Sequence, residues 1–303
     1  MRIAVIGLGD IAQKAYLPIL TSLDNVQLVL CTRNAEQLQQ LAQKYRIAAT
    51  ETDYRKLAEQ GVQAAFVHTA TASHREIVAY LLQQGIDVYV DKPIADNAAD
   101  TEQLLALAQA CGRLLMTGFN RRYAPMYQAL ASQPQRQVIL MQKNRRFQPA
   151  PLRQFVFDDF IHVVDTLLFL APAAVSEMQV SANIVDGLTR HIVLHLSGEN
   201  FSASGIMHRD SGITEEVLEV LSPGQKWRVT GMQNTSHYAQ GLETQQALKD
   251  WDSALYRRGF PQIIQHFLSR VSARTTPATL TSETADSDLA THLMCERIVK
   301  ALE

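Results

Sequence analysis

The chain has 303 residues, which is enough for two domains that each have a core of their own. Hydrophobic residues make up 47% and charged residues 19%, as in an ordinary globular protein. The formal net charge of −2 excludes the strongly basic character of many nucleic-acid-binding proteins. No apolar run reaches the length of a membrane span, and Asp10 ends the first run too early for a secretory signal. We therefore expect a cytoplasmic protein that binds neither nucleic acid nor a membrane.

The first 119 residues alternate between strand and helix signals. Five apolar runs predict strands, at residues 2–6, 26–31, 64–68, 86–90 and 114–118. Helical patterns separate them at 37–42, 74–84 and 96–110, the last with Asp96 as its N-cap. This alternation predicts an α/β fold, with a doubly wound parallel sheet of the Rossmann type in residues 1–119.

The pattern changes after residue 119. A strand is predicted at 137–146 and a helix at 155–170, followed by strands near 178–185, 189–197, 201–208, 215–221 and 225–232. Ser222-Pro223-Gly224-Gln225 predicts a hairpin turn, and two helices, 261–271 and 284–302, end the chain. We expect residues 120–303 to form an α/β domain with an open, largely antiparallel sheet. Alternating Val, Ile and Leu predict that another subunit covers one sheet face, in a homodimer or homotetramer.

A dinucleotide fingerprint follows the first strand. Gly7 permits a tight turn, Gly9 lets a pyrophosphate approach the backbone, and Ala12 keeps the next helix close to the strand. Asp10, Ile11 and Ala12 open that helix, whose N-terminal N–H groups suit phosphates. The alternative is an ordinary glycine-rich turn.

The end of the second strand bears on the choice of cofactor. NAD-selective sites usually place an acid there, whereas this chain has Thr32 and Arg33. A guanidinium can grip a 2′-phosphate with two donors, which favours NADP and leaves NAD possible. Arg33 could instead be a solvated loop residue.

Polar residues also follow the third and fourth of the expected strands. Thr69, Thr71 and His74 are expected to face the cofactor, although Ser73 could simply cap the next helix and His74 only pack against it. Asp91-Lys92-Pro93 ends the run at 86–90. We expect Lys92 to hydrogen-bond the reacting oxygen and stabilise alkoxide charge.

Asp158, His162 and Asp165 are spaced as one stripe of a helix. His162 is suited to take a proton from a substrate hydroxyl, and Asp158 to orient the imidazole. The alternative is that Asp158 or Asp159 caps the helix and that His162 and Asp165 form a solvated face. No further cluster completes a metal site, and Cys31, Cys111 and Cys295 lack metal-ligand spacing and are expected to be reduced core residues.

Four segments together resemble the glucose–fructose oxidoreductase / inositol dehydrogenase / MocA family, and within it the MviM-type oxidoreductases. The segments are Gly7-x-Gly9-x-x-Ala12, Asp91-Lys92-Pro93, the run from Gly118 to Pro125, and Asp158-x-x-x-His162-x-x-Asp165. The resemblance covers essentially the whole chain and implies NAD(P)-dependent oxidation or reduction of a sugar, polyol or similar compound. It places the catalytic lysine at Lys92 and the catalytic Asp and His at Asp158 and His162. Asp91, Lys92, Asn120 and Arg122 are expected cofactor contacts.

The chain departs from the family pattern at three places. Asp91 replaces the usual Glu, Phe155-Val156-Phe157 occupies a stretch where many members have glycines, and Phe160 stands where a glycine is common. Bulky residues there affect the size of the pocket and could line a site for a large apolar substrate, or they could be core residues. A further alternative is a non-catalytic NAD(P)-binding sensor, although Lys92, Asp158 and His162 favour an enzyme. The basic pairs at 121–122, 145–146 and 257–258 are expected to contact anions or carboxylates locally.

Overall fold

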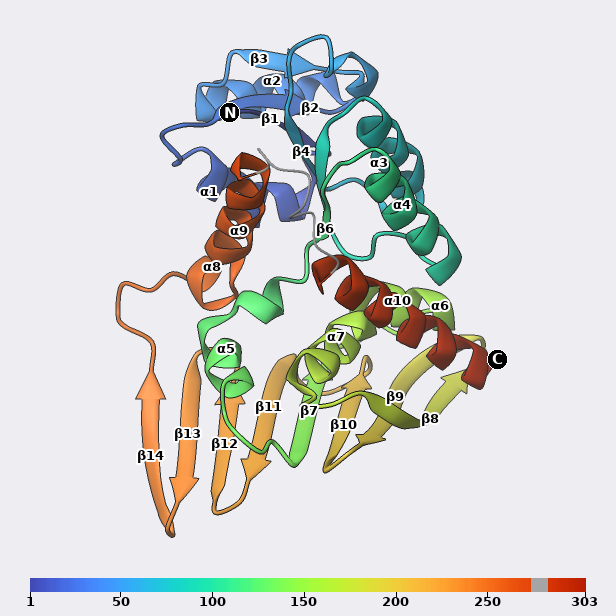
Figure 1. Ribbon diagram of the computed structural model, residues 1–303, viewed down its shortest axis with the longest axis vertical. Helices are drawn as coiled ribbons and strands as arrows, with labels where there is room; N and C mark the ends of the chain where they lie inside the picture. Colours follow the sequence, from blue (N-terminus) through green and yellow to red (C-terminus); the bar gives the residue numbers. More distant parts are fainter. Residues whose placement is uncertain (274–282) are drawn as a thin grey trace. The chain divides into compact units, whose positions relative to one another are not determined.

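The computed structural model describes residues 1–273 and 283–303, which form two compact units (Figure 1). The first unit comprises Met1–Gly118 and Ile263–His292, and the second comprises Phe119–Gln262 and Leu293–Glu303. These units differ from a simple division after residue 119, because the described residues from Ile263 to His292 pack with the first unit. A C-terminal segment that was expected in the second domain therefore belongs to the first unit.

The first unit contains a six-stranded parallel sheet with the strand order β3-β2-β1-β4-β5-β6. Its strands are β1 (Arg2–Ile6), β2 (Gln27–Cys31), β3 (Ala49–Glu51), β4 (Ala64–Val67), β5 (Asp87–Val90) and β6 (Leu115–Thr117). The order confirms the predicted doubly wound fold and reverses between β1 and β4, the point where such sheets bind dinucleotides. Only β3 was not predicted, because three residues give too short a pattern.

Helices join these strands and cover the sheet. They are α1 (Leu17–Leu20), α2 (Ala35–Tyr45), α3 (His74–Gln83), α4 (Ala98–Ala110), α9 (Phe260–Ser272) and the first half of α10 (Glu283–Leu302). The predicted helices are confirmed, but the predicted N-cap Asp96 of α4 is wrong by one residue. Asn97 is the cap, and its side-chain oxygen accepts from the N–H of Asp100 at 2.8 Å. Both residue types favour this position, so the sequence did not separate them.

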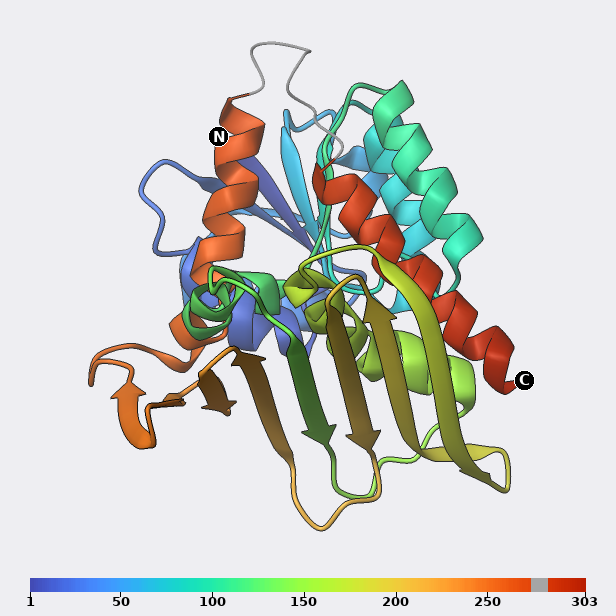
Figure 2. The same ribbon diagram turned by 60° about the horizontal axis from the view of Figure 1, so that its bottom comes forward.

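Alternate strand residues bury into opposite faces of this sheet. Val67 and Val90 join a core cluster with residues of α3 and α4. Phe66 and Tyr89 point the other way, and the Phe267 ring of α9 lies 5.2 Å and 5.6 Å from their ring centroids. Figure 2 shows α9 on one side of the sheet and the α3–α4 pair on the other. These contacts explain why the segment from residue 263 belongs to the first unit.

The second unit contains an eight-stranded sheet with the order β14-β13-β12-β11-β7-β10-β9-β8. Its strands are β7 (Val138–Asn144), β8 (Val175–Val185), β9 (Leu188–Gly198), β10 (Phe201–His208), β11 (Glu215–Ser222), β12 (Gln225–Thr230), β13 (Asn234–Ala239) and β14 (Leu242–Ala247). Only the β7–β10 pair is parallel, which confirms the predicted open, largely antiparallel sheet. The predicted hairpin is also confirmed, since Ser222 pairs with Gln225 and Gly224 has φ of +71°. β13 and β14 were missed because their residues are mostly polar.

Helices pack on one face of this second sheet. They are α5 (Pro125–Ala131), α6 (Leu152–Phe155), α7 (Ile161–Leu170) and the end of α10, and α8 (Ala254–Arg257) lies in the connection after β14. α7 lies so close to β10 that a Cβ on Gly205 would come within 2.5 Å of Val163. The other face leaves apolar side chains such as Leu140 exposed, and its cover by a second subunit stays a prediction. None of the described helices is both long and apolar enough to cross a membrane.

Candidate functional site

The turn after β1 is shaped by a glycine that no other residue could replace without strain. Gly7 has φ of +83°, and a Cβ on it would lie 2.7 Å from the backbone nitrogen of Thr69 and 2.8 Å from the carbonyl carbon of His68. The end of β1 therefore packs directly on the end of β4, at the point where the strand order reverses. Gly7 is required by the chain's own packing as well as by the turn.

Gly9 differs from Gly7, because a Cβ on Gly9 would meet no atom within 4 Å. Packing within the described chain does not require a glycine here, whereas the close approach of a pyrophosphate to the backbone would. The helix begins directly afterwards, since the N–H of Gln13 donates to the carbonyl of Gly9 at 3.1 Å. The first N–H groups of that helix, at Asp10, Ile11 and Ala12, precede its first intrahelical bond and suit phosphate oxygens. The turn therefore fits a dinucleotide.

The end of β2 carries Thr32 and the exposed Arg33. A carboxylate that the sequence analysis did not consider, Glu51 at the end of β3, is the register partner of Cys31. It accepts from the N–H groups of Thr52 and Asp53 at 2.8 Å and 3.1 Å and from the Gln60 amide at 2.9 Å. The N–H groups of Asp53 and Thr52 lower the pKa of Glu51, and the three bonds together occupy both of its oxygens.

Thr69 and Thr71 are half-buried at the end of β4, whereas His74 is fully buried. The His74 ring places Nδ1 2.8 Å from the carbonyl oxygen of Pro93 and Nε2 2.9 Å from that of Thr69. Burial lowers the pKa of His74 despite these bonds. Because both ring nitrogens contact backbone carbonyls, His74 holds two loops of the site together and does not present a nitrogen to a ligand. The alternative that Ser73 caps α3 through its side chain is not found.

Asp91 and Lys92 lie at the end of β5, both half-buried. Oδ1 of Asp91 accepts from the backbone N–H of Lys92 at 2.8 Å, and Oδ2 lies 3.8 Å from Nδ1 of His68. Burial raises the pKa of Asp91, but the His68 ring and Lys92 outweigh it, so the pKa lies below its usual value. Asp91 is therefore an ionised carboxylate beside the lysine.

A second buried histidine braces the same segment. His292, in the first half of α10, accepts from the N–H of Ile94 through Nε2 at 3.0 Å and donates through Nδ1 to the carbonyl of Asp288 at 2.7 Å. Lys92 is thus followed by two backbone groups, at Pro93 and Ile94, that buried histidines hold. No local pattern pointed to His292, since it lies 198 residues after Ile94 along the chain.

In the second unit, Asp158 and His162 lie on the turn and helix that follow α6. Val156–Phe160 form a π-helical turn that runs into α7, and both side chains are half-buried. No side-chain capping bond occurs at either start, so the alternative of a capping aspartate is wrong. Asp165 is 1% exposed and bonded to Arg122, so it does not belong to a solvated face either.

Asp159 was not predicted as a site residue, yet it is the centre of a group of charges. It accepts from the Lys143 ammonium, and the Arg145 guanidinium lies 3.1 Å away through Nε. Burial raises the pKa of Asp159, but Lys143 and Arg145 lower it far below its usual range. Arg209 Nε lies 3.9 Å from the same carboxylate. Arg145 therefore contacts a carboxylate, as was expected of the basic pairs.

The basic pair Arg121-Arg122 also binds carboxylates. Arg121 binds Glu216 with two bonds of 2.8 Å and 2.7 Å, and Tyr127 donates to the same Glu216 at 3.0 Å. Arg122 donates to Asp165 at 2.9 Å through Nε and at 2.5 Å through Nη2. The Asn120 amide donates to the carbonyl of Arg258 at 2.7 Å. Asn120 and Arg122 thus have partners within the second unit, and their contact with a cofactor stays a prediction.

Comparison with known proteins also divides the chain into two regions. Residues 1–119 match the model of an oxidoreductase family with an NAD-binding Rossmann fold, and residues 125–240 match that of a YceM-like C-terminal domain. The protein YceM of Salmonella typhimurium is 33% identical over 311 positions, which cover 100% of this chain and 97% of YceM.

The chain belongs to the Gfo/Idh/MocA family of oxidoreductases. A crystal structure of a family member from Vibrio cholerae has a TM-score of 0.93 at 33% identity and covers 99% of this chain and 97% of its own. The dehydrogenase MviM from Clostridium difficile also has a TM-score of 0.93, at 32% identity, and covers 100% of this chain and 99% of its own. The resemblance to this family is confirmed.

The departures from the Gfo/Idh/MocA pattern have a structural explanation in the second unit. Phe155, Phe157 and Phe160 are each 0% exposed and belong to its hydrophobic core. They therefore do not line a pocket for a large apolar substrate, and the expectation that they are core residues is confirmed.

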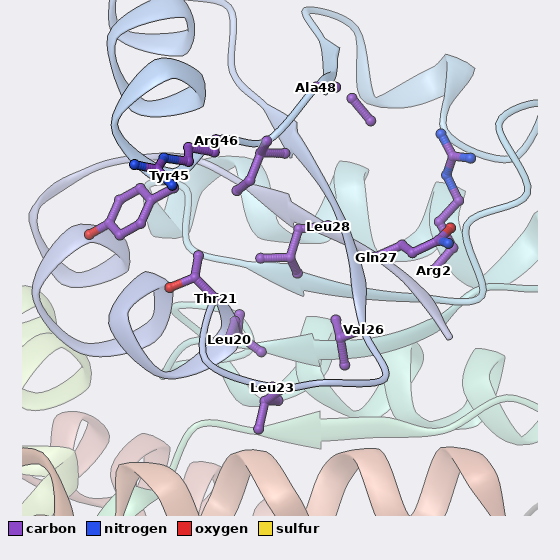
Figure 3. Close-up of a pocket in the computed structure, with 12 residues that line it drawn as sticks. Arg2, Leu20, Thr21, Leu23, Val26, Gln27, Leu28, Tyr45, Arg46 and Ala48 are labelled. Atoms are coloured by element: carbon purple, nitrogen blue, oxygen red, sulfur yellow. The ribbon is translucent and has the colours of Figure 1, made fainter.

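A hollow of about 340 Å³ occurs elsewhere in the Rossmann unit (Figure 3). Its lining includes Arg2 and Gln27, the first residues of β1 and β2, together with Tyr45 and Arg46. It therefore lies at the amino ends of the strands, whereas open parallel sheets of this kind bind ligands at the carboxyl ends. No group of three or more metal-ligating side chains occurs among the residues that the structure describes.

Proposed function

We propose that the protein is an NAD(P)-dependent oxidoreductase that transfers a hydride between a nicotinamide and the carbinol or carbonyl carbon of a small, polyhydroxylated substrate. One observation carries the proposal. The Gly7–Gly9 turn, Thr69 and Asp91-Lys92 follow β1, β4 and β5, so they share the carboxyl edge of one sheet on both sides of its switch point.

NADP is the cofactor that these residues favour. A nicotinamide cofactor, when bound, supplies or accepts the hydride. The Gly7–Ala12 turn would hold its phosphates, and Thr32 with the exposed Arg33 would hold a 2′-phosphate. Glu51, the carboxylate nearest in register, already accepts three hydrogen bonds and so is less available to a ribose 2′-hydroxyl.

The proton chemistry is assigned to three side chains. In the oxidation of a carbinol, the substrate hydroxyl loses its proton, and His162 takes it at a ring nitrogen. Lys92 donates a hydrogen bond to the same oxygen and stabilises its developing negative charge. Asp158, one helical turn before His162, orients the imidazole. The reverse reaction returns the proton to the carbonyl oxygen.

Calorimetric titration with NADPH and, separately, NADH tests the cofactor assignment. Tight binding of NADPH with weak binding of NADH is the expected result. The reverse preference would overturn the assignment of Arg33 and leave the oxidoreductase proposal in place. Binding of neither would overturn the proposal itself.

Turnover on a panel of sugars and polyols then tests the three catalytic assignments. Lys92→Ala and His162→Ala should each lower kcat by about 100-fold or more, with cofactor affinity changed by no more than about threefold. Lys44→Ala, an exposed lysine at the end of α2, is the matched control and should keep full activity. Near-normal turnover in both site variants would show that the assignment is wrong. Cofactor binding without turnover on any substrate would favour a non-catalytic sensor.

A further inference from the structure

Three basic side chains of the second unit converge on one carboxylate. Lys143 and Arg145 both donate to Asp159, and Nε of Arg209 lies 3.9 Å from its Oδ2. The neighbouring Asp158 adds a second negative charge that acts on Arg209. In this group of side chains, which we call the Asp159 cluster, three basic side chains face two carboxylates.

Arg209 is the member of the Asp159 cluster with the fewest partners. Its Nε and Nη1 atoms are buried and have no hydrogen-bond acceptor among the residues that the structure describes. At 3.9 Å the Asp159 carboxylate is too distant for a hydrogen bond. A buried donor without an acceptor is destabilising, and more so when it is charged. An oxyanion within reach of Arg209 would remove that cost.

A second buried arginine, Arg121 in the short helical turn Asn120–Tyr123 before α5, shows what full pairing looks like. Arg121 forms two hydrogen bonds with Glu216, one from each of two guanidinium nitrogens. The Arg121–Glu216 and Lys143–Asp159 pairs are both buried near the end of β7, since Glu216 on β11 is the register partner of Lys143 on β7. The lack of such a partner at Arg209 is therefore a local feature of this residue, not a general property of the sheet edge.

The Arg209 guanidinium packs on an aromatic ring, and its backbone is hydrogen-bonded to neighbouring segments of the chain. Its guanidinium carbon lies 5.4 Å from the centroid of the Phe155 ring, which is 0% exposed. Its backbone N–H donates to the carbonyl of Arg190 at 2.7 Å, and its carbonyl accepts from Gln148 at 2.7 Å. The side chain keeps 13% of its exposure, so it is accessible from solvent. A guanidinium that packs on an aromatic ring, stays partly exposed and has donors without an acceptor has the properties of a binding group.

Burial disfavours the charged forms of two members of the Asp159 cluster, as the directions of their pKa shifts show. Burial, with Arg145, lowers the pKa of Arg209 more than Asp159 and Asp158 raise it. Burial, with Arg121 and Arg145, lowers the pKa of Lys143 to about 7 despite the attraction of Asp159. A bound anion would raise both pKa values, because a nearby negative charge favours the charged form of a basic group.

We infer that Arg209, with Arg145, binds an anionic group of the substrate, a carboxylate or a phosphate, next to Asp158. The inference rests on the proposed function, since Asp158 and His162 would act on the hydroxylated part of the same molecule. Guanidinium donors match the oxygens of both anions. The substrate class is therefore a sugar acid or sugar phosphate rather than a neutral polyol.

Calorimetry with three matched sugars tests this inference on the full chain, in the presence of whichever of NADPH and NADH binds. The probes are D-glucose, D-glucuronate and D-glucose 6-phosphate, which share a ring and differ in the group at one carbon. At least one of the two anionic sugars should bind about tenfold or more tightly than glucose. The better of the two identifies carboxylate or phosphate as the preferred group. Equal binding of all three, or binding of none, would overturn the inference.

Substitution of Arg209 locates the effect. Arg209→Gln should remove the preference for the anionic sugar, while Arg228→Gln should keep it. Arg228 is a suitable control because it is half-exposed and pairs with Glu219 in the same sheet. A preference that survives in Arg209→Gln would overturn the assignment. The titrations with NADPH and NADH alone separate the two proposals. Binding of neither cofactor would overturn the proposed function, whereas cofactor binding with equal affinity for the three sugars would overturn only the assignment of Arg209.

Discussion

Two regions are built by different means: the carboxyl edge of the first sheet, and the charged edge of the second, by which we mean the end of β7 and the start of β11 with Lys143, Glu216 and their partners. At the first, short segments that follow β1, β4 and β5 supply backbone geometry, glycines and loop carbonyls within a few residues of each strand end. At the second, ion pairs join residues far apart in the chain, such as Arg121 and Glu216, which are 95 residues apart. The first edge is a local motif in which a Cβ on Gly9 would meet no atom within 4 Å. The second is a non-local arrangement whose charges depend on the complete fold of the unit.

Arg121→Gln should have the largest effect on stability, because it leaves the Glu216 carboxylate buried without its bidentate partner. We expect a loss of about 3–5 kcal/mol in the free energy of unfolding of the second unit. Fluorescence in urea reports this unit, since both tryptophans of the chain, Trp227 and Trp251, lie in it. Arg228→Gln, at an exposed pair, should cost no more than about 1 kcal/mol. Equal losses in the two variants would contradict a charged edge on which the fold depends.

Acid should destabilise the second unit through the same carboxylate. Arg121 and Lys143 outweigh burial and lower the pKa of Glu216 to about 2, from an ordinary value of 4.5. The stabilisation is therefore complete above about pH 4.5 and is lost as the pH falls towards about 2, up to about 3 kcal/mol in all. Glu216→Gln should be less stable at pH 7 but should show a flatter dependence between pH 5 and pH 3. If the free energy of unfolding of Glu216→Gln fell with pH as steeply as that of the unchanged protein, Glu216 would not be the cause of the acid sensitivity.

Alanine at each fingerprint glycine should separate packing from ligand binding at the first edge. Gly7→Ala should cost about 2 kcal/mol or more, because its φ is +83° and its Cβ would clash with the backbone of Thr69. Gly9→Ala has no such clash and should change the free energy of unfolding by no more than about 1 kcal/mol. The same variant should lower affinity for NAD(P) by about tenfold, which calorimetry measures. Normal affinity in Gly9→Ala would mean that the turn does not approach a pyrophosphate.

Arg33→Ala should have the smallest and most selective effect. Loss of a guanidinium that grips a 2′-phosphate should weaken NADPH binding by about tenfold. NADH lacks this phosphate and serves as the internal control, with an unchanged dissociation constant. Parallel weakening of both cofactors would indicate a role for Arg33 in the loop rather than in recognition.

Much of the fold and of the first edge could be predicted from sequence. The Gly7-x-Gly9-x-x-Ala12 turn, the strands around it and Asp91-Lys92 are local patterns, in which neighbouring residues determine the backbone that they form. The predicted N-cap Asp96 failed only because Asn97 satisfies the same local rule. The polar strands β13 and β14 failed because a sheet can recruit strands through pairing alone, without an apolar pattern.

The sequence by itself determined the class of each unit, the family and the presence of the candidate groups Lys92, Asp158 and His162. Only the tertiary structure decided which partners the charged and aromatic side chains have. It placed His74 between two carbonyls, His292 behind Ile94, and the phenylalanines around Phe157 in the core. It also brought Lys143, Arg145 and Arg209 to Asp159. The physical reason is that charge balance and burial depend on distances in space, which β-strand pairing sets between residues that no local pattern connects.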